Sequence, residues 1–211
     1  MGVVRIGVLG GTFDPIHNGH IRLAEEAMSR LKLAQVLFIP AGQPRFKIDS
    51  DISAAEHRVE MVRLAIAGRP CFKLSTMEVE RPGPSYTVDT MAELQAQYGA
   101  EAELFFLLGW DTLAQLPQWK EPARLIKLCR LVAVPRPGYA LPDLAVMAEV
   151  IPGLSRRVIV LDRPVVDISA TGLRTRAIQG LSLHHLVPEP VEDYIRQHGL
   201  YSTQAESDKL G

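Results

Sequence analysis

The sequence has little cysteine and almost no net charge. Its 211 residues include two cysteines, Cys71 and Cys129, without the paired spacing of a zinc site or a disulfide framework. Both stand beside apolar residues, which predicts buried free thiols. The 23 basic and 24 acidic residues give a formal charge of -1. No general electrostatic field therefore attracts a nucleic-acid polymer, and any anion site must be local.

Long hydrophobic runs are also missing. The segment Met1 to Leu9 is too short for a secretory signal peptide and lacks a small-residue cleavage site. No other segment offers the roughly 20 apolar residues that a membrane-spanning helix needs. We therefore expect a cytoplasmic protein without a membrane partner, and the 47% hydrophobic content is enough to build one core.

Short apolar segments alternate with segments of helical period. Five main strands are predicted near 3–9, 36–40, 71–75, 103–108 and 131–134, with another near 158–161. Helices are predicted over 21–31, 56–66, 87–98, 171–180 and 191–198. This alternation favours an α/β fold, a Rossmann-like doubly wound parallel sheet with helices on both faces. We expect one domain over residues 1–201 and a flexible tail over 202–211.

Several helix ends carry residues with capping chemistry. Ser53 and Glu56 have the spacing of a capping box, and Asn18 and Thr87 are suited to N-cap positions. Gly99 can supply a left-handed stop after the helix over 87–98. These residues define architecture, and only the helix start near Asn18 adjoins a stretch with chemical potential.

That stretch follows the first predicted strand. Residues 10–20 are Gly-Gly-Thr-Phe-Asp-Pro-Ile-His-Asn-Gly-His. The glycines let a ligand approach the backbone, and the helix start offers free amides to a phosphate. His17 and His20 are three residues apart, so both rings can donate to one anion. The combination favours a phosphate site over a simple tight turn.

Other ligands fit this stretch less well. A zinc site at the histidines is disfavoured because their spacing is three rather than the four of HExxH, and no third ligand is adjacent. The stretch also lacks the GxGxxG fingerprint and the GxxxxGK[ST] P-loop pattern. Hydride transfer and P-loop hydrolysis are therefore not supported.

A second candidate anion site lies near 168–176. Ser169 and Thr171 can cap a helix or donate hydroxyl hydrogen bonds, and Arg174 offers a fork suited to phosphate. Taken alone, this segment is better explained as a capped surface helix; together with residues 10–20 it predicts a second phosphate clamp. The proline-rich segment 135–142 follows a strand and is a candidate binding loop.

The two elements resemble known signatures. Residues 11–20 match GxFDPxHxGH, and residues 168–174 match ISSTxxR except that Ala170 replaces the second serine. By these motifs the chain is similar to nucleotidyltransferases, and among them to bacterial nicotinate-mononucleotide adenylyltransferases, over nearly its whole length. The resemblance extends to shorter elements at Pro44 to Lys47, Pro84 to Asp89, Gly109 to Asp111, Trp119 to Lys120, and the turn at Arg136. The hydroxyl contact missing at Ala170 must be lost or supplied by another group.

The resemblance implies an adenylyl transfer. The 5′-phosphate of nicotinate mononucleotide attacks the α-phosphorus of ATP, giving nicotinate adenine dinucleotide (deamido-NAD) and pyrophosphate in NAD biosynthesis. A phosphate oxygen needs no general base, so the protein works by alignment and charge stabilisation. Mg²⁺ is expected together with ATP, without a dedicated protein metal site, and Asp14 and Asp111 are only weak candidate ligands.

The resemblance also implies roles for individual residues. The residues expected to carry catalysis are His17, His20 and Arg174. Those expected to bind ATP are Gly10, Gly11, Phe13, His17, His20, Ser169, Thr171 and Arg174. Those expected to bind the mononucleotide are Lys47, Tyr86, Thr87, Asp111, Trp119, Lys120 and Arg136. Stacking on Trp119 and the amides at the Thr87 helix start favour a nicotinate carboxylate over the amide.

Alternatives remain open at the level of the sequence. The acceptor could be nicotinamide mononucleotide or phosphopantetheine, and a nucleotide-binding regulator without transfer activity is a further alternative. The sequence does not define the oligomeric state. It raises the hypothesis that Pro44 to Ser53 closes over the ligand as a lid.

Overall fold

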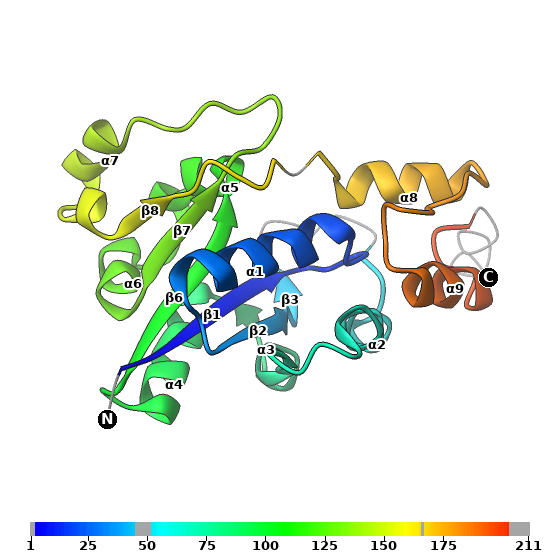
Figure 1. Ribbon diagram of the computed structural model, residues 1–211, viewed down its shortest axis with the longest axis horizontal. Helices are drawn as coiled ribbons and strands as arrows, with labels where there is room; N and C mark the ends of the chain where they lie inside the picture. The colour runs from blue at the N-terminus through cyan, green and yellow to red at the C-terminus, as the bar shows by residue number, and fades with distance from the viewer. Residues whose placement is uncertain (1–2, 45–51, 166, 203–211) are drawn as a thin grey trace.

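The computed structural model describes residues 3–44, 52–165 and 167–202. Six parallel strands form its main sheet in the order β4-β2-β1-β6-β7-β8 (Figure 1). They are β1 (Val4–Gly11), β2 (Gln35–Pro40), β4 (Phe72–Leu74), β6 (Ala102–Gly109), β7 (Arg130–Val134) and β8 (Val158–Val160). The chain adds strands outward from β1 on one side and then, from β6, on the other. This is the strand order of a Rossmann-like doubly wound fold, as predicted.

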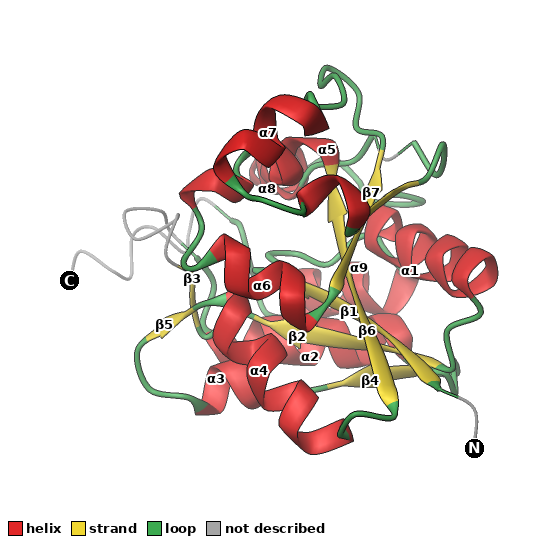
Figure 2. Ribbon diagram, turned by 90° about the vertical axis from the view of Figure 1, so that its left-hand side faces the viewer, coloured by secondary structure: helices red, strands yellow, loops and turns green. Residues whose placement is uncertain are grey.

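Helices cover both faces of the sheet (Figure 2). The helices of one face are α1 (Asn18–Leu31), α2 (Ala55–Ile66), α8 (Ala170–Ile178) and α9 (Glu189–Gln197). Those of the other are α4 (Thr87–Tyr98), α5 (Trp110–Ala114), α6 (Pro122–Leu128) and α7 (Leu144–Val150). In β6, Phe105 and Leu107 join the first core while Leu104, Phe106 and Leu108 join the second. Residues 104–108 of β6 are buried on both sides of the sheet, which is why they form a continuous apolar run.

Several short elements were not predicted. The strands β3 (Gln43–Pro44) and β5 (Pro84–Ser85) form a separate parallel pair, and α3 is a single turn over Met77–Glu80. The helices α5 to α7 and the 3-10 turns at Leu116–Gln118 and Leu154–Arg156 are equally short. Elements of two to seven residues do not show a reliable periodicity in the sequence.

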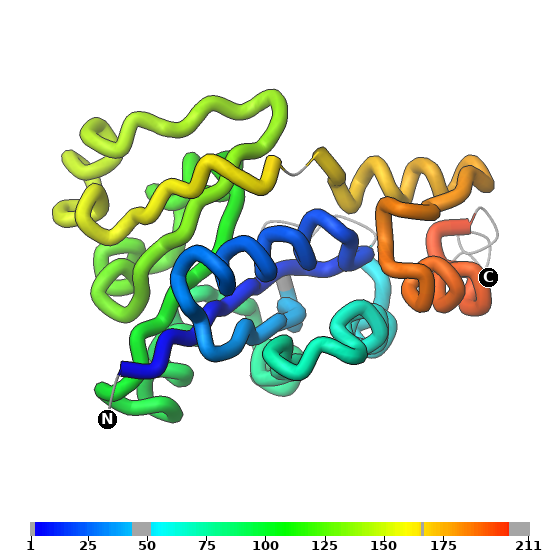
Figure 3. Tube along the Cα trace, viewed as in Figure 1, coloured from blue at the N-terminus to red at the C-terminus, as the bar shows by residue number. Residues whose placement is uncertain are grey.

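The chain crosses the molecule after β8 (Figure 3). From that edge strand it runs to α8 and then to α9, which packs against α2. The C-terminal helices thus lie beyond the carboxyl end of β1, beside α2 (Figure 1). The domain boundary at residue 201 stays a prediction, and the predicted tail lies outside the described residues apart from Ser202. No helix in the described part is long and apolar enough to cross a membrane.

The predicted caps of α1 and α4 were each wrong by one residue. His17 is the N-cap of α1, and Asn18 is its first helical residue. The amide Nδ2 of Asn18 instead donates to the carbonyl oxygen of His185 at 2.9 Å. Likewise Tyr86, not Thr87, is the N-cap of α4. The predicted stop is confirmed, since α4 ends at Gly99 with a φ of 73°.

Two further local predictions were wrong. The N-cap of α2 is Ala54 rather than Ser53, and the Ser53 backbone N–H that a capping box would direct to Glu56 donates to Asp14 Oδ2 at 3.1 Å. The prediction of a buried thiol is confirmed for Cys129, and desolvation raises the pKa of this thiol to about 12. The same prediction is wrong for Cys71, which is exposed. Cys71 precedes β4, an outer strand with a neighbour on one side only, so less of it is covered.

A buried arginine holds the ends of β1 and β2 together. Arg58 on α2 is 2% exposed. Its Nη1 donates to the carbonyl oxygens of Thr12 at 3.0 Å and Ala41 at 2.6 Å. Its Nε donates to Ser53 O at 2.9 Å, and its Nη2 to Gly42 O at 3.3 Å. Charge-assisted hydrogen bonds offset the loss of water around the guanidinium and fix where the backbone leaves both strands.

We expect Arg58→Met to lower the free energy of unfolding by about 3 kcal/mol or more, because buried carbonyl groups lose their donors. Urea denaturation followed by circular dichroism measures this. The control is Arg63→Met on the same helix, where an exposed arginine pairs with Glu60 and the loss should stay below about 1 kcal/mol. Equal losses of stability in the two variants would contradict the proposed role of Arg58 in holding the ends of β1 and β2 together.

Candidate active site

A cavity of about 340 Å³ lies at the carboxyl ends of three neighbouring strands. Its lining includes residues 9–11 of β1, 106–109 of β6, and Val134 of β7 with the following Pro135 and Arg136. The strand order reverses between β1 and β6. Open α/β sheets bind ligands in the crevice at this point, so the cavity is the candidate active site.

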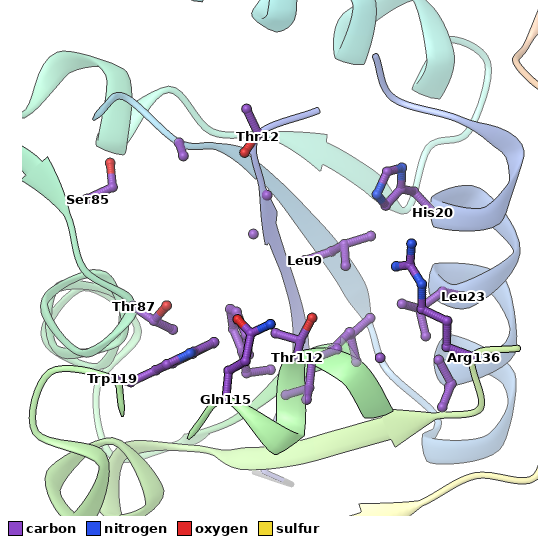
Figure 4. A pocket seen from close by; sticks show the side chains of 18 of the residues that line it. Leu9, Thr12, His20, Leu23, Ser85, Thr87, Thr112, Gln115, Trp119 and Arg136 are labelled. Carbon is purple, nitrogen blue, oxygen red and sulfur yellow. The ribbon is translucent and has the colours of Figure 1, made fainter. Parts of the chain in front are cut away.

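The cavity has two sides of different chemistry (Figure 4). On the α1 side lie His20, Leu23 and Arg136. On the side of α4 and α5 lie Ser85, Thr87, Gln115 and Trp119. Between them run Leu9 and Thr12, at the end of β1 and just after it. The first side therefore carries imidazole and guanidinium donors, and the second a helix start and an indole ring.

The two histidines of the first motif stack on each other. Their ring centroids are 3.7 Å apart and the ring planes differ by 26°. The backbone N–H of His17 donates to Nδ1 of His20 at 3.2 Å. Because Nδ1 accepts this bond in the neutral ring, the proton of His20 resides on Nε2. Both rings line the cavity, as the spacing had suggested.

His17 is uncharged in the folded protein. Its side chain is 4% exposed, and burial together with the Arg136 guanidinium lowers its pKa from 6.5 to about 3. A neutral imidazole still has one N–H donor. The positive charge on this side of the cavity therefore comes from Arg136 rather than from His17.

The glycines and Phe13 of the motif have different positions. Gly10 and Gly11 line the cavity, whereas Phe13 is buried outside the lining. Phe13 has a φ of 52°, and its ring meets His20 edge to face with centroids 5.0 Å apart. Phe13 supports the histidine rather than facing the cavity.

Asp14 ties the motif to three other segments. Its Oδ2 accepts the Ser53 N–H at 3.1 Å, and its Oδ1 accepts the Tyr201 hydroxyl at 2.5 Å. Its backbone oxygen accepts from Arg174 Nη1 at 2.8 Å. Tyr201 was not singled out from the sequence, because a tyrosine near the end of a chain carries no local signal. Asp14 thus positions the loop before α1.

The second motif is joined to the first through Arg174 but does not line the cavity. Ser169 is the N-cap of α8 and accepts the Gly172 N–H at 3.1 Å. Thr171 accepts from Arg174 Nη2 at 3.4 Å. The predicted phosphate contacts of these three residues therefore lie beyond the cavity, where α8 begins.

Tyr86, Thr87 and Lys120 lie together on the second side of the cavity. The Nζ of Lys120 lies 4.4 Å from the centroid of the Tyr86 ring and 2.9 Å from Asp89 Oδ2. This ion pair holds Lys120 at the first turn of α4. The helix start offers backbone amides at the same place.

Trp119 and Arg136 each contact another side chain of the protein. The indole of Trp119 meets Phe106 edge to face at 5.9 Å. Arg136 Nη1 lies 3.1 Å from Asp111 Oδ2. Asp111 itself does not line the cavity, so it acts on the site through Arg136.

Some residues fall outside the prediction or outside the structure. Thr112, Gln115 and Glu78 line the cavity but were not predicted. Thr112 and Gln115 follow the end of β6 at a spacing of three, a signal that could have been used. Lys47 lies outside the described residues, as does most of the hypothetical lid from Pro44 to Ser53.

No group of three or more His, Cys, Asp or Glu able to hold a metal occurs within 3–44, 52–165 and 167–202. The two weak candidates have other partners. Asp14 accepts from Ser53 and Tyr201, and Asp111 pairs with Arg136. In the described structure, protein donors therefore do not form a metal cage around the cavity.

Comparison with known proteins gives a family match and close relatives. The family model described as Cytidylyltransferase-like matches residues 8–176. A protein of Dehalococcoides mccartyi (strain ATCC BAA-2266 / KCTC 15142 / 195) named "Probable nicotinate-nucleotide adenylyltransferase" is 48% identical over 201 residues, 95% of this chain and 98% of its own. A protein of Roseiflexus sp. (strain RS-1) with the same name is 48% identical over 196 residues, 93% and 97% of the two chains.

Solved structures resemble the fold at lower identity. "Plasmodium falciparum nicotinic acid mononucleotide adenylyltransferase complexed with NaAD" superposes with a TM-score of 0.77 at 17% identity, covering 94% of this chain and 97% of that one. The same enzyme complexed with APC gives a TM-score of 0.73 at 16% identity. At such identities the likeness concerns the fold alone.

The family match begins in β1 and ends in α8, so it includes both signature motifs. The two relatives extend over almost the whole chain. The chain belongs to the cytidylyltransferase-like family and, within it, to the nicotinate-nucleotide adenylyltransferases.

Proposed function

We propose that the protein transfers the AMP moiety of ATP to nicotinate mononucleotide, forming nicotinate adenine dinucleotide and pyrophosphate in a cytoplasmic pathway of NAD biosynthesis. The observation that carries this proposal is the two-sided cavity where the strand order reverses between β1 and β6. Imidazole and guanidinium donors on one side suit phosphates. A helix start and an indole ring on the other suit a pyridine carboxylate.

The α1 side serves the phosphates of ATP. The neutral His17 and the His20 Nε2–H donate hydrogen bonds, and Arg136 supplies positive charge. Gly10 and Gly11 leave room for the nucleotide to approach the backbone. Ser169, Thr171 and Arg174 hold the β- and γ-phosphates, which requires ATP to extend past Asp14 to the start of α8.

The reaction is a single in-line displacement. An oxygen of the mononucleotide 5′-phosphate forms a bond to the α-phosphorus of ATP while the bond from that phosphorus to the β-phosphate bridging oxygen breaks. The electron pair leaves with pyrophosphate, and the attacking oxygen carries no proton that must be removed. The histidines contribute by aligning the phosphates and by stabilising charge that develops at the α-phosphorus.

The acceptor side selects the acid form of the pyridine. Amides at the Tyr86–Thr87 helix start hold the carboxylate, Trp119 stacks on the ring, and Lys120 adds positive charge. A carboxamide has no negative charge, so its binding is stabilised less by the helix-start amides and by Lys120. Asp111 orients Arg136, and Lys47 is proposed as a further phosphate contact.

We propose that ATP is bound together with a divalent metal, Mg²⁺. Its chemistry is to neutralise the pyrophosphate that leaves. Asp14 is bound through both carboxylate oxygens and Asp111 through Oδ2 only, so the metal would be held mainly by phosphate oxygens and water.

Pyrophosphate release from ATP and Mg²⁺ tests the acceptor. Nicotinate mononucleotide, nicotinamide mononucleotide and phosphopantetheine are compared at equal concentrations, and we expect a clear preference for the first because only it carries the pyridine carboxylate. Turnover confined to another acceptor would refute the assigned acceptor side. Nucleotide binding without release from any acceptor would instead favour a regulator.

Replacing His20 by alanine should lower kcat by ~10²–10³-fold, the usual effect of removing a donor that stabilises transition-state charge. Steady-state kinetics measures this, and circular dichroism checks the fold. The exposed His184→Ala is the control and should retain full turnover. A folded His20→Ala enzyme with nearly normal kcat would remove His20 from the mechanism.

His17 should stay neutral between pH 8 and pH 5 in the free protein, which nitrogen chemical shifts of its imidazole report. Its folded pKa of about 3 lies below 6.5, so its contribution to stability is complete above pH 6.5 and is lost as the pH falls toward 3. The stability of His17→Asn should depend less on pH in this window, whereas exposed His184→Gln should behave as wild type. A His17 ring that protonates near pH 6.5 would contradict the assignment.

A further inference from the structure

Glu78 is a buried acid in the cavity wall that the proposed chemistry does not use. It lies on α3, is 8% exposed and lines the cavity. Burial is the main cause that raises the pKa of its carboxyl above 4.5. A buried carboxylate next to a site for anions is unfavourable unless other groups satisfy it. Its partners therefore indicate what it does.

Two hydroxyl groups converge on the carboxylate of Glu78. The Thr90 Oγ1 donates to Oε1 at 2.6 Å, and the Ser85 hydroxyl donates as well. Ser85 directly precedes Tyr86 and Thr87, and Thr90 lies in the first turn of α4. Glu78 thus binds the chain on both sides of the helix start that is proposed to hold the acceptor carboxylate.

Each hydroxyl is also an acceptor, so two chains of hydrogen bonds end at Glu78. The N–H of Gly42 donates to Ser85 Oγ at 3.0 Å. Arg81 Nη1 donates to Thr90 Oγ1 at 3.2 Å, while its Nη2 donates to Glu93 at 2.7 Å. Chains of this kind polarise one another and resist rotation of the hydroxyls.

The backbone around Glu78 is equally constrained. A Cβ atom on Gly42 would lie 2.1 Å from the carbonyl oxygen of Glu78, so only glycine fits there. The pairing of β3 with β5 brings Gln43 opposite Pro84. The segment after β2, the turn α3 and the start of α4 therefore form one unit with Glu78 at its centre.

This placement argues against a direct chemical role. Ser85 and Thr87 lie across the cavity from His20, away from the phosphate donors (Figure 4). The carboxylate of Glu78 accepts hydrogen bonds from the hydroxyls of Thr90 and Ser85, which hold it at the α4 side of the cavity. The proposed phosphate nucleophile needs no base.

We propose that Glu78 is a positioning residue of the acceptor site, which fixes the Tyr86–Thr87 helix start through Ser85 and Thr90 and thereby sets the affinity for the mononucleotide but not for ATP. This inference rests on the proposed function. A glutamine at this position has one acceptor oxygen, and its amide group opposes one of the two hydroxyl donors. The helix start is then released without any change on the α1 side of the cavity.

The experiment compares steady-state kinetics of Glu78→Gln with those of the wild type. We expect the KM for nicotinate mononucleotide to rise about tenfold, with kcat and the KM for ATP changed less than about twofold, since one hydrogen bond to a charged group is lost. Thr90→Val should raise the same KM, and Thr90→Ser should restore it because the hydroxyl returns. The double variant Glu78→Gln/Thr90→Val should resemble the single variants, as expected for one shared contact.

The matched control is Glu80→Gln. Glu80 lies on the same turn α3 and also accepts a threonine hydroxyl, from Thr76 at 2.5 Å, but it does not line the cavity. Its kinetic constants should equal those of the wild type. Thermal unfolding of each variant is measured in parallel. If Glu78→Gln does not fold, the comparison of Thr90→Val with Thr90→Ser decides the question.

An unchanged KM for the mononucleotide in Glu78→Gln and Thr90→Val would overturn the inference. A rise in both KM values together with a fall in kcat would also overturn it, because this would indicate a general loss of structure. If the wild-type enzyme uses a different acceptor, the proposed function fails first, and the same comparison is made with that acceptor. An unchanged KM there would again refute the role of Glu78.

Discussion

Four backbone carbonyl oxygens converge on the buried guanidinium of Arg58, and the geometry of the site depends on this contact. It joins Thr12, which follows β1, to Ala41 and Gly42, which follow β2. The positive charge also lies close enough to Asp14 to interact with it. Because Asp14 is itself bound by Ser53, Tyr201 and Arg174, segments from four parts of the chain fix one loop. The preorganisation proposed for the phosphates follows from this loop rather than from any single ligand-binding residue.

The neutral state of His17 is a consequence of burial and of the nearby Arg136 guanidinium, which together lower its pKa. Its ring is stacked on His20 and is too buried to hold a charge beside Arg136. Within the described part of the chain, this side of the cavity offers the Arg136 guanidinium and the imidazole groups of His17 and His20. Hydrogen-bond donors held in place need little rearrangement during the transfer, whereas flexible solvated cations would have to be ordered first. The separation of the phosphate side from the acceptor side follows from the strand order, which opens the crevice between β1 and β6.

Those features that a local pattern determines could be predicted from the sequence. All six strands of the main sheet were placed to within two residues, because each is mostly a short apolar run, even at the less buried outer strands β4 and β8. The signature motifs led to His17, His20 and Gly10, which the structure places around the cavity. What could not be predicted depends on contacts between distant segments. Ser53 had the pattern of a cap, but Asp14 takes its N–H. Tyr201 and Glu78 acquire their partners only when the chain has folded.

Three carboxylates surround a site for anionic nucleotides, and in each case the surroundings account for their presence. Asp14 is bound by an amide and a phenol, Asp111 by Arg136, and Glu78 by two hydroxyls. Each acid therefore has at least one cation or hydrogen-bond donor of its own, although Oδ1 of Asp111 has no hydrogen-bond partner among the described residues. Asp14 fixes the loop before α1, Asp111 fixes the position of Arg136, and Glu78 is proposed to fix the start of α4. Removing such an acid would reduce repulsion of the ligand in principle, yet it would also release the donors that the ligand needs. The acids are compatible with anion binding because they hold the groups that bind the ligand in position.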